Sequence, residues 1–166
     1  MNVEEEILSF LEGLGVKYPL LRHEPAHTMA QCAACEQALC GLMPKNLFLT
    51  PRRRASYHLL VMRPDLEYQA SVVSAQAGTS RLGFADEEAL FRLLRTRPGS
   101  ISPLGLMFDA EKQVRLLVDR ALRQQERLLF HPCDNRASLA LSGADFFEKV
   151  LPALGREPVY IDLQYK

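Results

Sequence analysis

The first fourteen residues carry apolar side chains at the spacing of an amphipathic helix. Val3, Ile7, Leu11 and Leu14 are three or four positions apart, and glycines punctuate the end of the run. Helices are predicted over residues 2–14, 28–39, 66–77, 87–94 and 143–151. Residues suited to capping a helix N-terminus precede or open three of them, namely Thr28, Asp86 and Ser142 or Gly143.

Short apolar runs between these segments predict strands. The strands cover residues 16–23, 46–50, 57–63, 81–85, 104–108, 113–118, 127–131, 137–141 and 158–163. Two hairpins are expected, one joining 46–50 to 57–63 and one joining 104–108 to 113–118. Because strands and helices alternate without a regular βαβα rhythm, we expect an α/β fold of the α+β type, with a mixed, largely antiparallel sheet and packed helices.

Length and charge narrow the classes of protein. A chain of 166 residues predicts one domain over residues 1–166. Its 20 basic residues balance 20 acidic ones, which excludes coating of nucleic acid by bulk charge but leaves room for a local basic patch. The acidic start differs from a secretory signal, and the apolar runs are far shorter than the ~20 residues that span a bilayer. We therefore expect a cytoplasmic protein with no membrane partner.

Two segments carry polar residues where a binding site could form. Lys45–Asn46 lies where a Gly/Pro turn enters an apolar strand, so the ammonium could hold a phosphate or oxyanion and the amide could fix a carbonyl. The alternative is a solvated pair. The loop Gly99–Pro103 could present backbone N–H groups to an anion or a carbonyl, or could be an ordinary connection. Neither segment belongs to a standard phosphate-loop, dinucleotide or hydrolase motif.

Histidine and cysteine raise further alternatives. His131, at the end of a predicted strand, could act as a base or an orienting group, or could be structural. His23 and His27 are separated by Pro25, which argues against a metal site. The four cysteines are expected to be reduced thiols; Cys32 and Cys35 fit buried apolar roles better than zinc or redox chemistry, because no second pair accompanies them.

A run of three arginines, Arg52, Arg53 and Arg54, occupies the turn of the first predicted hairpin. Such runs are usually a solvated face. This one lies a few residues from Lys45, so it could also guide a phosphate backbone towards that strand.

The order of several segments resembles the YbaK/ProX family of aminoacyl-tRNA editing domains, which are related to the insertion domain of bacterial prolyl-tRNA synthetase. The resemblance runs from about residue 16 to residue 163. It rests on the following segments in order: His-Glu-Pro at 23–25, KNLFL at 45–49, RLGFA at 81–85, PGSISPLGL at 98–106, FHP at 130–132 with Asn135, and PVYIDL at 158–163. The second and fourth of these look closest to the free-standing alanyl-tRNA(Pro) deacylases.

The resemblance implies a fold with a partial barrel and a hydrolase that removes the wrong amino acid from tRNA(Pro), with alanine as the expected amino acid. Lys45 would hold a phosphate or stabilise charge near the ester, and Asn46 would position the substrate. The loop residues Gly99, Ser100, Ile101, Ser102 and Pro103 would present backbone N–H groups to the ester carbonyl, and His131 would order the site. The implied partners are the acceptor end of tRNA(Pro), held in part by Arg52, Arg53 and Arg54, and prolyl-tRNA synthetase. No metal or organic cofactor is implied.

Two other functions stay open. One is a catalytically inactive relative that binds tRNA or the synthetase, or senses an amino acid. The other is a regulator that depends on the thiols of Cys32 and Cys35. The segment Met29–Cys40 is richer in cysteine than the family pattern leads us to expect, so it could line the pocket and change which amino acid fits. The sequence fixes neither that amino acid nor the oligomeric state.

Overall fold

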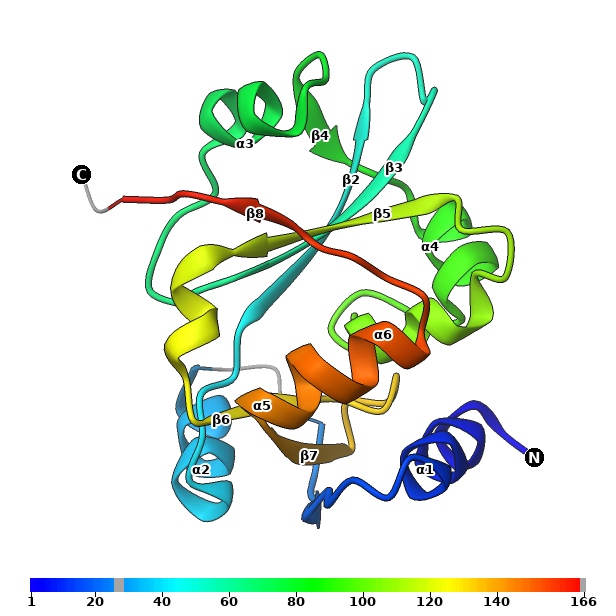
Figure 1. The fold of residues 1–166 in the computed structure, drawn as a ribbon, viewed down its shortest axis with the longest axis vertical. Coiled ribbons are helices and arrows are strands. Elements are labelled where there is room, and N and C mark those ends of the chain that lie inside the picture. Colours follow the sequence, from blue (N-terminus) through cyan, green and yellow to red (C-terminus); the bar gives the residue numbers. More distant parts are fainter. Residues whose placement is uncertain (26–28, 165–166) are drawn as a thin grey trace.

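The computed structural model describes residues 1–25 and 29–164, and this part of the chain forms two sheets (Figure 1). The larger sheet has the strand order β4-β2-β3-β5-β8, and the smaller one has the order β1-β7-β6. The strands are β1 (Leu20–Arg22), β2 (Lys45–Pro51), β3 (Tyr57–Met62), β4 (Leu82–Phe84), β5 (Val114–Asp119), β6 (Arg127–Phe130), β7 (Ala137–Ser142) and β8 (Val159–Ile161). Of the neighbouring pairs, β3–β5 and β5–β8 are parallel and the others are antiparallel. The expected mixed, largely antiparallel arrangement is confirmed.

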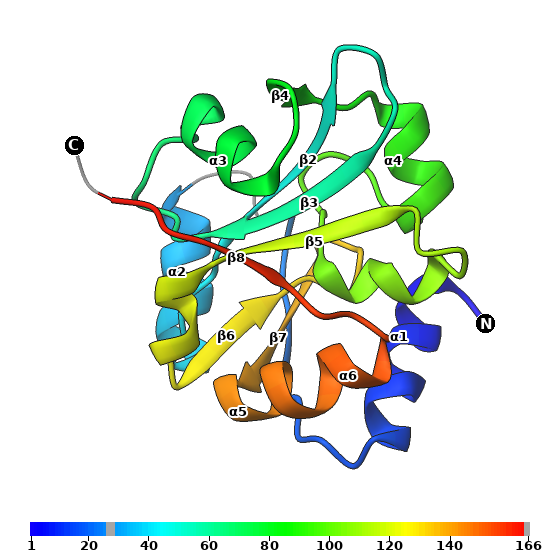
Figure 2. The same cartoon turned by 45° about the horizontal axis from the view of Figure 1, so that its top comes forward.

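Helices cover the sheets on several sides (Figure 2). They are α1 (Val3–Gly13), α2 (Met29–Leu39), α3 (Ala70–Ala77), α4 (Glu87–Leu94), the 3₁₀ helices η1 (Pro103–Phe108) and η2 (Arg120–Gln124), and a final run of α5 (Gly143–Asp145), η3 (Phe146–Val150) and α6 (Leu151–Ala153). The predicted caps Asp86 and Ser142 are confirmed, because their side chains accept hydrogen bonds from the Ala89 and Asp145 amides at 2.8 and 3.0 Å. The predicted cap Thr28 lies outside the described residues. No helix of the described part is both long and apolar enough to cross a bilayer.

The first predicted hairpin is confirmed and the second is wrong. β2 and β3 pair antiparallel, whereas β5 lies parallel to β3 and residues 104–108 belong to η1. Pro103 starts this 3₁₀ helix, and Ser102 caps it by accepting a hydrogen bond from the Leu104 amide at 3.2 Å. Gly105 lets η1 approach α4, since a Cβ there would lie 2.7 Å from the Leu94 carbonyl oxygen. Close packing against α4 therefore replaces the strand that the apolar run predicts.

Three elements are shorter than predicted. β1 begins after Pro19, whose ring leaves no amide to donate to a sheet, and β8 is limited to Val159–Ile161. α3 begins only at Ala70, because residues 63–66 form a turn in which the Leu66 amide donates to the Arg63 carbonyl at 3.4 Å.

The core is divided into three layers by the two sheets. The first lies between the sheets, where Phe48 and Leu59 of the larger sheet meet Phe130 and Leu139 of the smaller one. The second lies between the other face of the larger sheet and α3, and the third lies between the outer face of the smaller sheet and α2. Buried apolar side chains on both faces of β2, β3 and β6 explain why these strands are continuous apolar runs in the sequence.

One short contact joins the two sheets. Leu42, just before β2, forms a parallel bridge with Leu128 of β6. Its amide donates to the Arg127 carbonyl at 3.1 Å, and its carbonyl accepts from the Leu129 amide at 2.8 Å. Among the described residues no closed barrel forms, and this bridge brings the start of β2 beside the end of β6.

Candidate active site

A small cleft of about 180 Å³ opens where the start of β2 meets the end of β6 and the loop between α4 and η1. Four residues predicted for the site lie in its wall: Asn46, Gly99, Ile101 and His131. They come from three segments far apart in the sequence. The remaining lining residues are Cys32, Met43, Pro44, Leu129 and Phe130.

Asn46, which lines this cleft, has an unsatisfied acceptor. Its Nδ2 donates to the Pro44 carbonyl at 3.4 Å. Its Oδ1 is buried and accepts no hydrogen bond from the described residues. An unpaired buried acceptor costs about 1–3 kcal/mol, so this oxygen is suited to receive a donor from a bound molecule.

Lys45 lies on the other face of β2. Successive side chains of a strand point to opposite faces, and the Lys45 ammonium donates to the carbonyl of Leu66. Lys45 is absent from the lining of the cleft, although both its chain neighbours belong to it. The structure therefore places Lys45 beside the cleft and separates its ammonium from Asn46.

The loop between α4 and η1, which lines the cleft, has two amides without an acceptor among the described residues. Gly99 has φ +90°, a backbone conformation that favours glycine. The Ser100 amide is used within the loop, donating to the Arg97 carbonyl at 3.1 Å, and the Ser100 carbonyl accepts from Thr96 Oγ1 at 2.9 Å. Within residues 1–25 and 29–164, the amides of Gly99 and Ile101 have no acceptor. These two N–H groups can donate to a carbonyl oxygen or an oxyanion.

Three other predicted loop residues are not brought into the cleft. Ser100 lines a larger neighbouring pocket, while Ser102 and Pro103 are buried at the start of η1. Ser102 caps that helix through its hydroxyl. These residues hold the loop in place, and the cleft itself is bounded by Gly99 and Ile101.

His131 is held as one neutral tautomer. Its side chain is buried, and Nδ1 lies 2.8 Å from the Ala137 carbonyl, so Nδ1 carries the proton and donates it. Burial lowers the pKa of His131; the Ala137 carbonyl opposes that shift and nearby His23 adds to it. The imidazole therefore remains neutral at pH 7, and Nε2 keeps a lone pair that can accept a hydrogen bond.

A chain of hydrogen bonds supports this imidazole from behind. Ser138 Oγ lies 3.5 Å from His131 Nδ1 and 2.8 Å from His23 Nε2. His23 Nδ1 in turn lies 2.7 Å from the Glu24 carbonyl, so it donates there and Nε2 accepts from the Ser138 hydroxyl. Every donor in this chain has an acceptor, which fixes both rings in orientation.

Three of the four cysteines are buried or half-buried, and Cys40 is exposed. Cys32 lines the cleft, and burial raises the pKa of its thiol, as do neighbouring Cys35 and Glu36. Cys35 packs against Leu129 in the third core layer. Burial raises the pKa of Cys133 to about 12, which keeps that thiol protonated. In the described part of the chain no group of three His, Cys, Asp or Glu residues could hold a metal ion, and His27 lies outside that part.

The arginine turn lies at the far end of β2 from the cleft. Arg52, Arg53 and Arg54 follow Pro51, six residues after Lys45, which is about 20 Å along a strand. Arg54 forms an ion pair with Asp86 at 3.4 Å. The structure therefore separates this basic turn from the residues of the cleft.

Sequence reasoning missed part of the cleft wall. Met43, Leu129 and Phe130 also line the cleft. They could have been found in the sequence, because they lie beside predicted site residues. Met43 and Pro44 directly precede Lys45–Asn46, and Phe130 directly precedes His131. The segment Met29–Cys40 reaches the cleft through Cys32, as the sequence predicts.

The fold and this cleft define a class of protein. The chain matches the family described as the aminoacyl-tRNA editing domain over residues 23–149, and it belongs to that family. The resemblance seen in the sequence is confirmed, and so is the class of enzyme, an aminoacyl-tRNA deacylase.

Particular relatives cover almost the whole chain. The "Prolyl-tRNA editing protein ProX" of Acetoanaerobium sticklandii is 28% identical over 163 residues, which is 98% of this chain and 99% of the relative. The "Prolyl-tRNA synthetase associated domain-containing protein 1" of Mus musculus is 29% identical and covers 97% of this chain and 96% of its own. A solved structure described as a candidate trans-editing enzyme for prolyl-tRNA synthetase has the same fold, with a TM-score of 0.73, 15% identity and 99% coverage of both chains.

Proposed function

We propose that this chain is a trans-editing enzyme that hydrolyses the aminoacyl ester of mischarged tRNA(Pro), and that alanine is the amino acid it removes. The names of its relatives support tRNA(Pro) as the substrate. The observation that carries the proposal is the convergence of the unpaired Asn46 Oδ1, the free amides of Gly99 and Ile101, and the neutral His131 on one cleft.

Each of these groups matches one need of ester hydrolysis. The carbonyl oxygen gains negative charge when water attacks, and the Gly99 and Ile101 amides would donate to it. Asn46 Oδ1 would accept a hydrogen bond from the α-ammonium of the amino acid. His131 Nε2 would accept one from a ribose hydroxyl or from the attacking water, which orders the reacting groups.

The size of the cleft favours a small amino acid. Its volume of about 180 Å³ is below the roughly 300–1,000 Å³ of sites that enclose a drug-sized ligand. Met43, Ile101 and Leu129 give it an apolar wall. A methyl side chain fits such a space, and the apolar wall is proposed to exclude the pyrrolidine ring of proline. A small site can reject a larger amino acid strongly, because the larger side chain does not fit. The proline site of prolyl-tRNA synthetase cannot reject the smaller alanine in this way.

Lys45 and the arginine turn have roles further from the ester in this proposal. Lys45 would bind a phosphate of the terminal nucleotide after its ammonium leaves the Leu66 carbonyl. Arg52, Arg53 and Arg54 would contact the acceptor stem at about 20 Å from the start of β2. Prolyl-tRNA synthetase is proposed as the partner that delivers the mischarged tRNA.

The test is deacylation of Ala-, Ser-, Cys- and Pro-tRNA(Pro) by the wild-type protein and by the Asn46→Ala and Lys45→Ala variants. The expected result is rapid loss of Ala-tRNA(Pro), preservation of Pro-tRNA(Pro), and at least tenfold slower hydrolysis by Asn46→Ala. Lys45→Ala is expected to raise KM more than it lowers kcat. A wild-type protein that binds tRNA but hydrolyses none of the four would overturn the proposal in favour of a catalytically inactive binding protein.

A further variant tests whether the cleft selects alanine over proline. Ile101→Ala enlarges the cleft by removing part of its wall, so it should admit larger amino acids. Discrimination between Ala-tRNA(Pro) and Pro-tRNA(Pro) should fall by roughly 10- to 200-fold, the usual range for small changes in an apolar pocket. Unchanged discrimination would place the specificity elsewhere.

A further inference from the structure

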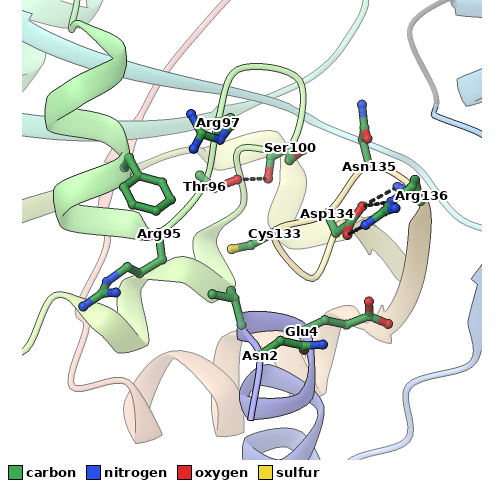
Figure 3. A pocket seen from close by; sticks show the side chains of 12 residues that line it. Asn2, Glu4, Arg95, Thr96, Arg97, Ser100, Cys133, Asp134, Asn135 and Arg136 are labelled. Atoms are coloured by element: carbon green, nitrogen blue, oxygen red, sulfur yellow. Dashed lines mark hydrogen bonds and ion pairs between the residues drawn. The ribbon is translucent and has the colours of Figure 1, made fainter.

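Figure 3 shows a second hollow, which is larger than the cleft and is lined by part of the same loop. We call it the basin; its volume is about 550 Å³. Ser100 lines the basin and its neighbours Gly99 and Ile101 line the cleft, so the same loop separates the two. On the other side, the turn Cys133–Arg136 lines the basin, and one residue, Pro132, separates it from His131 of the cleft.

Two arginines of the basin have no carboxylate partner in the part of the chain that the structure describes. Figure 3 shows Arg95 and Arg97 on one side and Arg136 on the other, with Cys133 between them. The two carboxylates of the basin are already paired: Glu4 with Arg22 at 2.7 Å, and Asp134 with Arg136 at 2.8 Å. Across the described ranges 1–25 and 29–164, neither Arg95 nor Arg97 forms an ion pair. The chain as a whole has a net charge of zero, so two guanidinium groups without a carboxylate partner among the described residues are a local feature here.

An exposed aromatic ring accompanies these arginines. Phe91 of α4 lines the basin and is 43% exposed, so part of its ring is open to a ligand. The Arg97 guanidinium carbon lies 4.9 Å from the centre of its ring. Proteins that bind single-stranded nucleic acid combine cationic groups with aromatic rings on which bases stack.

We propose that the basin binds the single-stranded 3′ end of the tRNA, with backbone phosphates at Arg95 and Arg97 and one base stacked on Phe91. This inference rests on the proposed function, because it starts from the aminoacyl ester in the cleft. The cleft is too small for a nucleoside and an amino acid together, so the nucleotides must leave it across an adjoining surface. The basin adjoins it across one loop and has a size typical of sites for nucleotide-sized ligands.

The test compares the binding of two deacylated tRNAs, intact tRNA(Pro) and tRNA(Pro) lacking its three 3′-terminal nucleotides, by fluorescence anisotropy. The wild-type protein should bind the intact form at least tenfold more tightly. Arg97→Gln and Arg95→Asn should each remove much of this difference and reduce the slope of log affinity against log salt by about 0.7 per lost phosphate contact. Asn is chosen at position 95 because Arg95 has φ +56°, which Asn tolerates. Phe91→Leu should weaken binding of the intact form by 5-fold or more, since stacking contributes about 1–3 kcal/mol per base.

Arg123→Gln is the matched control. The Arg123 guanidinium lies 5.0 Å from the ring centre of Phe147, which is nearly the geometry of Arg97 on Phe91. It belongs to η2, which lies away from α4 in both views (Figures 1 and 2). Its affinity for both tRNAs should equal that of the wild-type protein. Thermal unfolding midpoints of all variants, expected within a few degrees of wild type, exclude loss of binding through misfolding.

The outcomes separate this inference from the proposed function. If the basin variants bind intact tRNA(Pro) as the Arg123→Gln control does, the basin is not the site of the 3′ end, whatever the hydrolysis assay gives. If the basin variants lose the preference for intact tRNA while the wild-type protein hydrolyses no ester, binding of the 3′ end in the basin is supported and the proposed editing activity is contradicted. Hydrolysis of 3′-O-alanyl adenosine by the basin variants at the wild-type rate would further support a role confined to the nucleotides beyond the terminal one.

Discussion

The imidazole rings of His23 and His131 meet edge to face, with ring centres 6.3 Å apart. His131 belongs to the cleft, whereas His23 lies behind it. A positive charge on His23 disfavours a second one on His131, and this effect adds to the burial that already lowers the pKa of His131. The electrostatic state of the cleft is therefore set partly by a residue outside it.

Replacing His23 should raise the pKa of His131. In His23→Gln the ring whose positive charge would disfavour one on His131 is replaced by a neutral amide, so the pKa of His131 should move upwards, while burial keeps it below the ordinary histidine value of about 6.5. The acid limb of the deacylation rate should move to higher pH in the same direction. The measurement is an NMR titration of the His131 ring, with the distant ring of His58 as internal control. An unchanged His131 titration would contradict the electrostatic link.

Asn46 should stabilise the free protein less than an apolar residue would. Asn46→Val removes a buried acceptor that has no partner and introduces a residue suited to a strand. We expect the free energy of unfolding to rise by about 1 kcal/mol, measured in urea, and kcat/KM to fall at least tenfold.

Thr50→Val on the same strand is the control for Asn46→Val. The Thr50 hydroxyl donates to the Ser56 carbonyl at 2.7 Å, so its removal should destabilise the protein by about 1 kcal/mol. If Asn46→Val and Thr50→Val destabilise the protein equally, Asn46 Oδ1 has a hydrogen-bond partner in solution and the expectation is contradicted.

The backbone of Gly99 should matter more for activity than for stability. In Gly99→Ala the added Cβ would lie 3.7 Å from Asn135 Nδ2, which is an ordinary contact distance. The φ of +90° nevertheless disfavours any side chain at this position. Gly78→Ala matches it, with φ +74° and open space around the Cβ, outside the cleft. Both variants should lose about 1–2 kcal/mol of stability in urea. Deacylation should fall only in Gly99→Ala, because only this change displaces the amides of the cleft; equal activity in both would remove them from the mechanism.

The stability of the fold should decline in acid through His58. Burial lowers the pKa of His58 to about 4, and Arg115 adds to this shift. The unfolded chain takes up this proton near pH 6.5 and the folded chain only near pH 4. This contribution to stability is therefore complete above pH 6.5 and is lost as the pH falls to about 4. In His58→Gln the fall in urea midpoint over that interval should be smaller than in the wild-type protein; an identical fall would assign the acid lability to other groups.

The parts of the fold predicted correctly depend on local sequence. The hairpin of β2 and β3 follows from two apolar runs around a polar turn, and α4 follows from the cap at Asp86. The partner of β5 could not be predicted, because parallel pairing with β3 and β8 joins segments more than forty residues apart in the chain. The strand predicted over residues 104–108 is wrong for a related reason, because these residues pack closely against α4, a contact that no local pattern in the sequence indicates.

The same distinction applies to the site. Asn46 and His131 can be predicted because each is a polar residue at an end of an apolar segment, and Gly99 because it belongs to a loop rich in turn-forming residues. Lys45 was expected to act with Asn46 because they are adjacent, yet a strand sends adjacent side chains to opposite faces. The basin was not predicted, because Phe91, Arg97 and Arg136 meet only after the loop and the turn around the cleft are folded.

The bridge between the two sheets leaves little freedom to the segment that precedes Asn46. Leu42 is bonded to β6 and Lys45 is paired with Met62 of β3, so two residues, Met43 and Pro44, connect two fixed points. One residue more or fewer here would reverse the facing of β2, turning the lysine into the cleft and the asparagine out of it. The side chains at positions 43 and 44 therefore set the shape of the cleft wall, while the number of residues between the two fixed points sets which side chain of β2 faces the cleft.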